Sequence, residues 1–234
     1  ELKTKPTQHS VKTLQESGVQ PDILVCRSEN NLGPEIKKKL ANFCNVQPNS
    51  VIESLDAKTI YEVPVLLKDQ NLDEVVLEKI GLPTNSKPDM RKWIDFLERH
   101  EKPSTEIEIG LIGKYVELKD SYKSITESLI HAGAKCLSRV NIRWIHSENL
   151  TRDNASKALE GLHGVIVAPG FGARGFEGKI EAVRIARKEG VPFLGICFGM
   201  QASVIEYARN VLNISNATSR EVDPDAKNAV IDLM

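Results

Sequence analysis

The chain has 234 residues, of which 41% are hydrophobic and 27% are charged, and its formal net charge is -1. This length allows one large domain or two smaller ones, and the balanced charge argues against general affinity for nucleic acids or membranes. No apolar run approaches the roughly 20 residues of a membrane-spanning helix, and residues 1–5 lack the apolar stretch of a signal peptide.

The first 80 residues alternate between predicted strands and helices, an order that is typical of a parallel sheet. Strands are predicted at 21–26, as a central strand, and at 51–55, and helices are predicted at 10–17, 35–44, 64–68 and 72–80. The opening segment Lys-Thr-Lys-Pro-Thr-Gln, residues 3–8, carries ammonium and hydroxyl groups that could converge on phosphate oxygens. On composition alone, a solvated terminus is the simpler interpretation of this segment, as a solvated face is for the lysine run 37–39.

Residues 81–104 do not continue the alternation of strands and helices, and this break predicts a connection between two domains. Gly, Pro, Asn and Ser residues make 81–88 a predicted loop. A charged helix is predicted at 90–101, and Lys102-Pro103-Ser104 ends it. We therefore expect an interdomain connection that contains one packed helix.

A second series of strands and helices follows this connection. Strands are predicted at 106–113, 140–145, 164–168 and 191–194, and helices at 121–132, 151–159, 180–189 and 202–213. Gly133 is placed to end the first of these helices. One side of the last helix is predicted to carry Val204, Ile205, Ala208, Val211 and Leu212. Alternation this regular predicts a doubly wound sheet with a site at the carboxyl ends of its strands.

The sequence Gly195-Ile196-Cys197-Phe198-Gly199 lies between the last predicted strand and the last predicted helix. A Cys between two glycines at such a turn is the thiol form of a nucleophile elbow, because bulkier residues two positions before and after it would collide. The turn aims Sγ outward at a helix N-terminus, where the partial positive charge favours the thiolate. A buried structural Cys is the alternative, and the flanking strand and helix with Met200-Gln201 favour the nucleophile.

The loop Pro169-Gly170-Phe171-Gly172 follows the preceding predicted strand, where an oxyanion hole would be needed. The backbone N–H of Gly170, together with that of Phe198, could bind a tetrahedral oxyanion. Glycine loops also occur as plain turns, so this prediction depends on the pairing of the loop with the elbow.

The four cysteines are widely spaced and include no Cys-x-x-Cys pair: Cys26, Cys44, Cys136 and Cys197. This spacing argues against a zinc site, and we assign no metal ligand in this chain. Cys26 and Cys44 lie in apolar patterns and are predicted to be buried thiols. A reducing, cytoplasmic setting fits these cysteines best.

Several motifs resemble known families. The elbow with Gln201, the loop at 169–172 and the segment 113–118 resemble a class I glutamine amidotransferase domain. Segments 3–12, 21–27, 43–46, 170–180 and 219–224 look like the CTP synthase family, so that the resemblance covers essentially the whole chain in order. It implies an α/β fold of two parallel-sheet units, the second doubly wound and flavodoxin-like. The implied domains are a C-terminal portion of the synthase domain at 1–82, a linker with one helix at 83–104 and an amidotransferase domain at 105–234.

The resemblance also implies a function and its residues. Members of this family make CTP from UTP with ATP, Mg²⁺ and ammonia released from glutamine, and Cys197 would form the glutamyl thioester. The positions that match glutamine-binding residues are Gly170, Phe198, Gly199, Met200, Gln201 and Glu221. The positions that match ligands of UTP, or of inhibitory CTP, are Lys3, Thr4, Lys5, Pro6, Thr7, Gln8 and Lys39. GTP is expected as an allosteric activator and a homotetramer as the assembly, and the nucleotide role replaces the solvated terminus as our interpretation of residues 3–8.

Some features of the family pattern are missing from this sequence. There is no Gly-x-x-x-x-Gly-Lys-Ser/Thr phosphate loop, so this loop and the Mg²⁺ ligands would precede Glu1. The family's catalytic His and Glu would follow the elbow, whereas all five histidines precede Cys197. The chain also lacks an initiator Met and has Pro169, which has no N–H, where a glycine is more usual. We therefore expect a piece of a longer enzyme that is inactive by itself.

Two other functions remain open at this point. The chain could act only as a catalytically incomplete nucleotide-binding or assembly module. Less favoured is a stand-alone thiol hydrolase on the same fold, since a hydrolase has no use for residues 3–8.

Overall fold

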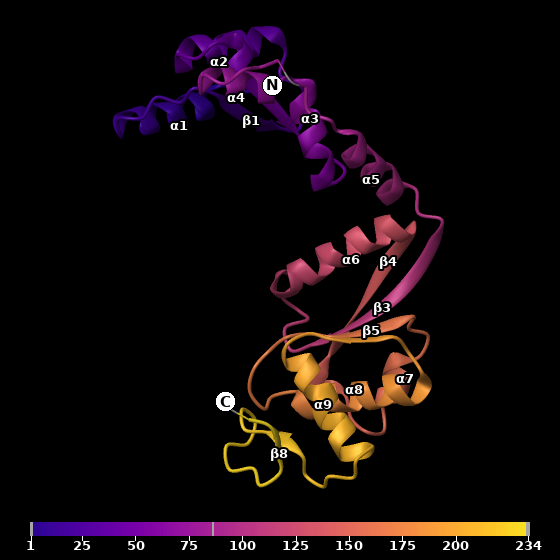
Figure 1. Ribbon diagram of the computed structural model, residues 1–234. Helices are drawn as coiled ribbons and strands as arrows, with labels where there is room; N and C mark the ends of the chain where they lie inside the picture. The colour runs from indigo at the N-terminus through magenta and orange to yellow at the C-terminus, as the bar shows by residue number, and fades with distance from the viewer. Residues whose placement is uncertain (1, 86, 233–234) are drawn as a thin grey trace. The chain divides into compact units, whose positions relative to one another are not determined.

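A computed structural model describes residues 2–85 and 87–232, and the chain divides into two units, Glu1–Leu97 and Glu98–Met234 (Figure 1). The division falls within helix α5, Arg91–Glu101. The predicted domain limits at 82/83 and 104/105 stay predictions, and residues 1, 86, 233 and 234 of the predicted ranges lie outside the described residues. Within the described ranges, no helix has both the length and the apolar character needed to cross a membrane.

The first unit is built on two parallel strands, β1 (Leu24–Ser28) and β2 (Val51–Leu55). Its helices are α1 (Lys5–Glu16), α2 (Pro34–Cys44), α3 (Val63–Asp69) and α4 (Leu72–Lys79), with 3-10 turns η1 (Pro48–Ser50) and η2 (Ile60–Glu62) (Figure 1). A small core joins both strands to α1 and α2 through Val11, Leu24, Leu40, Ala41, Cys44 and Val51.

Two expectations for this unit need correction. Helix α1 begins at Lys5 rather than at residue 10, because Pro6 suits the first turn, where its missing N–H costs nothing. Gln8 Nε2 also donates to Thr4 Oγ1, at 3.1 Å, across this first turn. Strand β1 was expected to be central, but the described residues pair it with β2 alone, and Val25 is 54% exposed.

Helix α5 packs on the first unit through its aromatic residues. The Trp93 and Phe96 rings lie 6.3 and 5.0 Å from the Tyr61 ring, centroid to centroid. Trp93 Nε1–H donates to the backbone oxygen of Tyr61 at 2.8 Å. These ring contacts and this hydrogen bond hold α5 on the first unit, while the predicted interdomain linker at 83–104 stays a prediction.

The second unit contains a parallel sheet in the order β4-β3-β5-β6. Its strands are β3 (Thr105–Gly113), β4 (Ser138–His146), β5 (Gly164–Val167) and β6 (Phe193–Gly195). Numbered within this unit, the order is 2-1-3-4, which is the flavodoxin-like arrangement with its switch point between β3 and β5. The predicted doubly wound α/β class is confirmed.

Helices cover both faces of this sheet (Figure 1). On one face Leu111 and Ile166 meet α6 (Lys123–Cys136). On the other, Ile112, Val165 and Val167 meet α7 (Ala155–Leu159), α8 (Phe176–Glu189) and α9 (Phe198–Asn210). The remaining elements are η3 (Lys119–Tyr122), η4 (Ser147–Asn149) and the paired strands β7 (Thr218–Ser219) and β8 (Ala229–Ile231).

Several predicted features of these helices were wrong. Gly133 does not end α6, which continues to Cys136 and ends at Leu137 with φ 53°. The glycine instead allows close packing, since a Cβ there would lie 2.5 Å from the backbone oxygen of Ser138. Helix α7 starts at Ala155, not at 151.

Candidate active site

The predicted elbow forms between β6 and α9. Cys197 has φ 53° and ψ -109°, a conformation that L-residues rarely adopt. A Cβ at Gly195 would lie 2.6 Å from the backbone oxygen of Gly199, and a Cβ at Gly199 would collide with the backbone oxygen of Val167. Both glycines are therefore required by close backbone approaches, and the strained Cys between them matches a nucleophile elbow.

The elbow presents the thiol and one backbone donor. Cys197 is exposed, whereas the Phe198 side chain is completely buried. Phe198 is the first residue of α9, and the first N–H groups of a helix have no acceptor within it. An exposed thiol at this end of a helix can attack an electrophile, and the adjacent N–H can bind the oxygen that becomes negative.

The glycine loop at 168–172 adjoins the elbow because β5 and β6 are neighbours, with Val167 paired to Gly195. The Ile196 N–H extends this pairing by donating to the Val167 oxygen at 3.0 Å. A Cβ built on Gly170 would lie 3.9 Å from Phe198 Cδ1. The structure therefore brings together the loop and the turn that were predicted to form an oxyanion hole.

Two buried lysines lie against this loop, and the sequence analysis did not assign them. Lys179, from the first turns of α8, has no exposed surface, and Lys114, just after β3, is 5% exposed. Lys179 Nζ donates to the Ala168 oxygen at 2.7 Å and to the Pro169 oxygen at 3.4 Å. Lys114 Nζ donates to the Phe171 oxygen and, at 3.4 Å, to the Gly172 oxygen.

The charge of Lys179 is sensitive to its surroundings. Burial, and secondly the Lys114 ammonium, lower the pKa of Lys179 from 10.5 to about 8, while the nearby Cys197 opposes the change. Periodicity offers one signal for its position, since Phe176, Ile180 and Val183 share the inward face of α8 with Lys179. A lysine on such a face, seven residues after the glycine loop, suggests a buried ammonium.

Other predicted glutamine-binding residues surround the same turn. The Gly172 N–H donates to Glu221 Oε1 at 3.1 Å, which ties the segment after β7 to the loop. Gln201 Oε1 is buried and has no hydrogen-bond partner among the described residues. Met200 is 50% exposed beside the elbow.

Among the described residues, neither His146 nor His163 lies at the thiol, where a general base would be needed. His146 is the last residue of β4, which lies at the opposite edge of the sheet from β6. Two strands intervene, so the spacing is roughly 14 Å. His146 Nδ1 accepts the Glu148 N–H at 3.3 Å, and His163 Nδ1 accepts the Glu108 N–H at 3.0 Å. Both imidazoles are thus engaged with residues other than the elbow.

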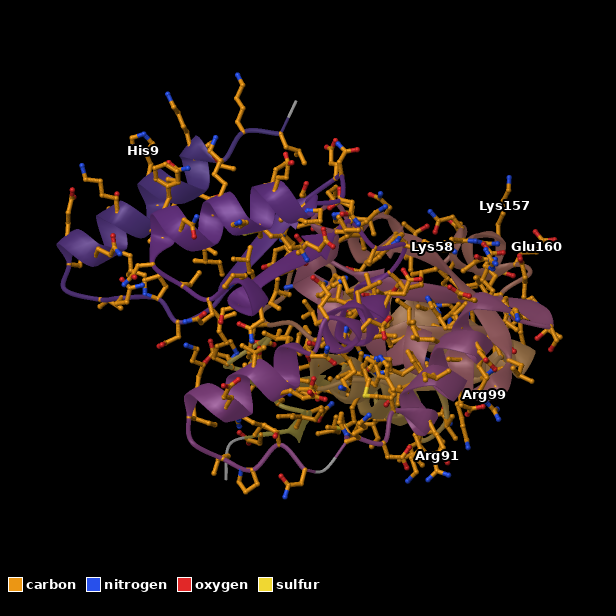
Figure 2. All side chains as sticks on the ribbon, turned by 90° about the horizontal axis from the view of Figure 1, so that it is seen from above. His9, Lys58, Arg91, Arg99, Lys157 and Glu160 are labelled. Atoms are coloured by element: carbon orange, nitrogen blue, oxygen red, sulfur yellow. The ribbon has the colours of Figure 1, made fainter. Side chains whose placement is uncertain are left out.

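The predicted nucleotide-binding residues lie in the first unit. Thr4 is buried, and Lys3, Lys5 and Lys39 are exposed. Residues 5–8 form the N-terminal turn of α1, a position that favours anions such as phosphate. His9 projects outward from the same helix (Figure 2).

A metal centre cannot be assigned from the described residues, where no three His, Cys, Asp or Glu side chains gather closely enough to hold an ion.

Comparison with known proteins agrees with this geometry. Residues 1–82 match a family model described as CTP synthase N-terminus, and residues 117–230 match glutamine amidotransferase class-I. Over all 234 residues the chain is 58% identical to a CTP synthase of Christiangramia forsetii and 57% identical to one of Flavobacterium psychrophilum. It spans 43% and 44% of the length of these two relatives.

A solved structure gives the same assignment for the second unit's fold. The Trypanosoma brucei CTPS glutaminase domain with bound acivicin superposes with a TM-score of 0.52 at 36% identity, covering 55% of this chain and 50% of that chain. Two family models in the expected order, similarity to named relatives over all 234 residues of this chain and a matching fold all agree. The chain therefore belongs to the CTP synthase family.

Proposed function

We propose that this chain supplies the glutamine-hydrolysing thiol and part of the nucleotide site of an enzyme that makes CTP from UTP, ATP and glutamine. The observation that carries the proposal is the strained, exposed Cys197 with the glycine loop beside it. The relatives that span the whole chain are named CTP synthases, which supports the same substrates here.

In the proposed reaction, Cys197 Sγ attacks the carboxamide carbon of glutamine and a C–S bond forms. The oxygen becomes negative and is bound by the N–H groups of Gly170 and Phe198. The C–N bond then breaks, the nitrogen leaves as ammonia after protonation, and water cleaves the thioester to glutamate. The family resemblance implies that a His moves this proton, and the five histidines of this sequence all precede Cys197.

The glutamine itself would be held by the other residues of the turn. Gly199, Met200, Gln201 and Glu221 are proposed to bind it, and the unpaired Gln201 Oε1 supports this role, because it is an acceptor suited to an ammonium group. Glu221 already reaches the loop through Gly172.

The first unit is proposed to bind UTP or inhibitory CTP. Lys3, Lys5 and Lys39 would bind phosphate oxygens, and Thr4, Pro6, Thr7 and Gln8 would complete the site at the start of α1. For the whole protein we further propose ATP with Mg²⁺ as cosubstrate, GTP as activator, a homotetramer and a cytoplasmic location, as the family resemblance implies.

The test is the Cys197→Ala variant of the whole protein that contains this chain. We expect loss of glutamine-dependent CTP synthesis and retention of ammonia-dependent synthesis, because ammonia bypasses the thiol. Equal loss of both would contradict the role of Cys197. The 234-residue chain by itself is expected to release no glutamate at a steady rate, and sustained release would instead favour a stand-alone thiol hydrolase.

A further inference from the structure

Lys114 and Lys179 are unusual among the basic residues of this chain. Lys58, Arg91 and Lys157 project from the surface (Figure 2), where lysines are normally found. Lys114 and Lys179 are at most 5% exposed, and burying an ammonium group is costly unless hydrogen bonds compensate. The burial of both lysines therefore indicates a specific role.

Both ammonium groups converge on one short stretch of backbone. Together they bind four carbonyl oxygens of the loop, those of Ala168, Pro169, Phe171 and Gly172. They also lie over one ring, at 5.1 Å (Lys179) and 5.8 Å (Lys114) from the centroid of Phe198, the residue that follows the nucleophile. The ring face stabilises both cations and links the loop to the elbow.

The orientation of these carbonyl groups fixes the orientation of the donors. In a trans peptide, the C=O of one residue and the N–H of the next point in opposite directions. Because the Pro169 oxygen points inward to Lys179, the Gly170 N–H points away from the buried ammonium. The same rule holds one step further, where the Phe171 oxygen faces Lys114 and the Gly172 N–H reaches outward to Glu221.

We propose that Lys179 and Lys114 are positioning residues that hold the loop carbonyls inward, so that the Gly170 N–H stays aimed at the oxygen of the bound amide. This inference rests on the proposed glutamine hydrolysis at Cys197. Neither lysine touches the substrate, and each acts through the backbone of the loop. Pro169, which lacks an N–H, makes the orientation of the next peptide especially important.

The test compares two reagents on Cys197 of the 234-residue chain. Iodoacetamide needs only the thiolate, whereas a chloroketone analogue of glutamine also places its carbonyl oxygen where the oxyanion develops. Mass spectrometry of the Cys197 peptide gives kinact and KI for the chloroketone and a rate constant for iodoacetamide. We compare variants by the ratio of the chloroketone rate to the iodoacetamide rate. A change in thiolate population affects both rates and cancels in this ratio.

For Lys179→Met we expect kinact of the chloroketone to fall roughly 10- to 100-fold, as for a misplaced oxyanion donor, with KI nearly unchanged and the iodoacetamide rate falling far less. Lys114→Met should act in the same direction. The control is Lys188→Met, an exposed lysine at the end of α8, which should leave the ratio at the wild-type value.

The outcomes separate this inference from the proposed function. Unchanged ratios in folded Lys179→Met and Lys114→Met proteins would overturn the positioning role. If Lys179→Met shows no cooperative unfolding transition, the result for Lys114→Met decides alone. If glutamine does not slow chloroketone labelling of the wild-type chain, the proposed glutamine site fails, whatever the lysines do.

Discussion

The side chain of Lys179 has no exposed surface. The energetic cost of burying its positive charge therefore depends on pH. The pKa of Lys179 is lowered from 10.5 to about 8, chiefly by burial. Between these two values the unfolded chain binds more protons than the folded chain. Stability therefore rises with pH across this window, and the full cost of the charge is present below it.

The pH dependence gives a first prediction. Wild-type protein should gain up to about 3 kcal/mol of unfolding free energy between pH 7 and pH 10.5 relative to Lys179→Met, which has no charge to lose. Urea unfolding of both proteins at several pH values measures the difference. Lys188→Met serves as the control and should follow the wild-type curve, and parallel curves for all three proteins would refute the lowered pKa.

Gly199 gives a second prediction at this scale. A Cβ at this position would meet the Val167 backbone, which cannot move without breaking the sheet. Gly199→Ala should cost about 3 kcal/mol. Gly33→Ala is the matched control, because nothing lies within 4 Å of its Cβ position and its φ is not positive. Similar unfolding midpoints for the two variants would contradict the packing argument.

The sequence predicted the elbow geometry around Cys197 but not the burial of the two lysines, for physical reasons, and the catalytic role of Cys197 remains a prediction. The elbow is a local device, and its steric requirement appears directly in the spacing of Gly195 and Gly199. The burial of Lys114 and Lys179 depends instead on three segments that meet, one after β3, one after β5 and one in α8. The helical periodicity around Lys179 is therefore only a partial signal, and Lys114 has none. The roles assigned to Gly170, Gln201 and Glu221 remain predictions.

At the scale of elements, a buried ion pair joins α8 to α9. Arg187 makes three hydrogen bonds of 2.7–3.2 Å to the Glu206 carboxylate, and Glu206 is only 1% exposed. Asn210 Nδ2 donates to the same carboxylate at 3.2 Å. Loss of the guanidinium would leave a buried negative charge with too few partners.

We therefore predict that Arg187→Met destabilises the chain by about 2 kcal/mol, a value reduced from the fully buried case because Arg187 is partly exposed. The double variant Arg187→Met/Glu206→Met should recover most of this loss. Arg139→Met, whose pair with Glu106 is exposed on both sides, should change stability by less than about 1 kcal/mol. A double variant no more stable than Arg187→Met would contradict the explanation.

Element boundaries were less predictable than element types. Strand β2 matches its predicted range, and every predicted helix has a counterpart. Yet α1 and α9 begin five and four residues earlier than the predicted positions 10 and 202. In both helices the first turn carries the motif residues. Pro6 shapes the first turn of α1 and the strained Cys197 precedes that of α9, and apolar periodicity cannot detect either turn.

At the scale of the whole molecule, each hydrophobic cluster lies within one unit. The cluster around Leu40 belongs to the first unit, and those around Ile112 and Leu111 belong to the second. Helix α5 contributes Trp93 to the first unit through Tyr61. Separate cores should give separate unfolding transitions.

Calorimetry of the chain should accordingly resolve two transitions. Trp93→Ala is expected to lower only the transition of the first unit, by about 2 kcal/mol, since its ring is partly exposed. Arg187→Met should lower only the other transition. Ile94→Ala, a change on an exposed neighbour in α5, controls for general loss of helix stability, and a single transition shifted by both Trp93→Ala and Arg187→Met would refute the prediction.

The strand order of the second unit was predictable because regular alternation with short connections leaves few topologies. The first unit was harder, since the segment of β1 was predicted as a central strand although β1 has an exposed face in this chain.

The hydrogen bond from Gly172 to Glu221 has a kinetic consequence. It closes a loop of 49 residues, whereas Lys179 reaches Ala168 across only 11. By loop-closure entropy the longer contact costs about 1 kcal/mol more to form, and contacts of longer range generally form later. As the chain emerges during synthesis, the lysine can shape the glycine loop before Glu221 exists, so the donor geometry precedes the contact with Glu221 in time.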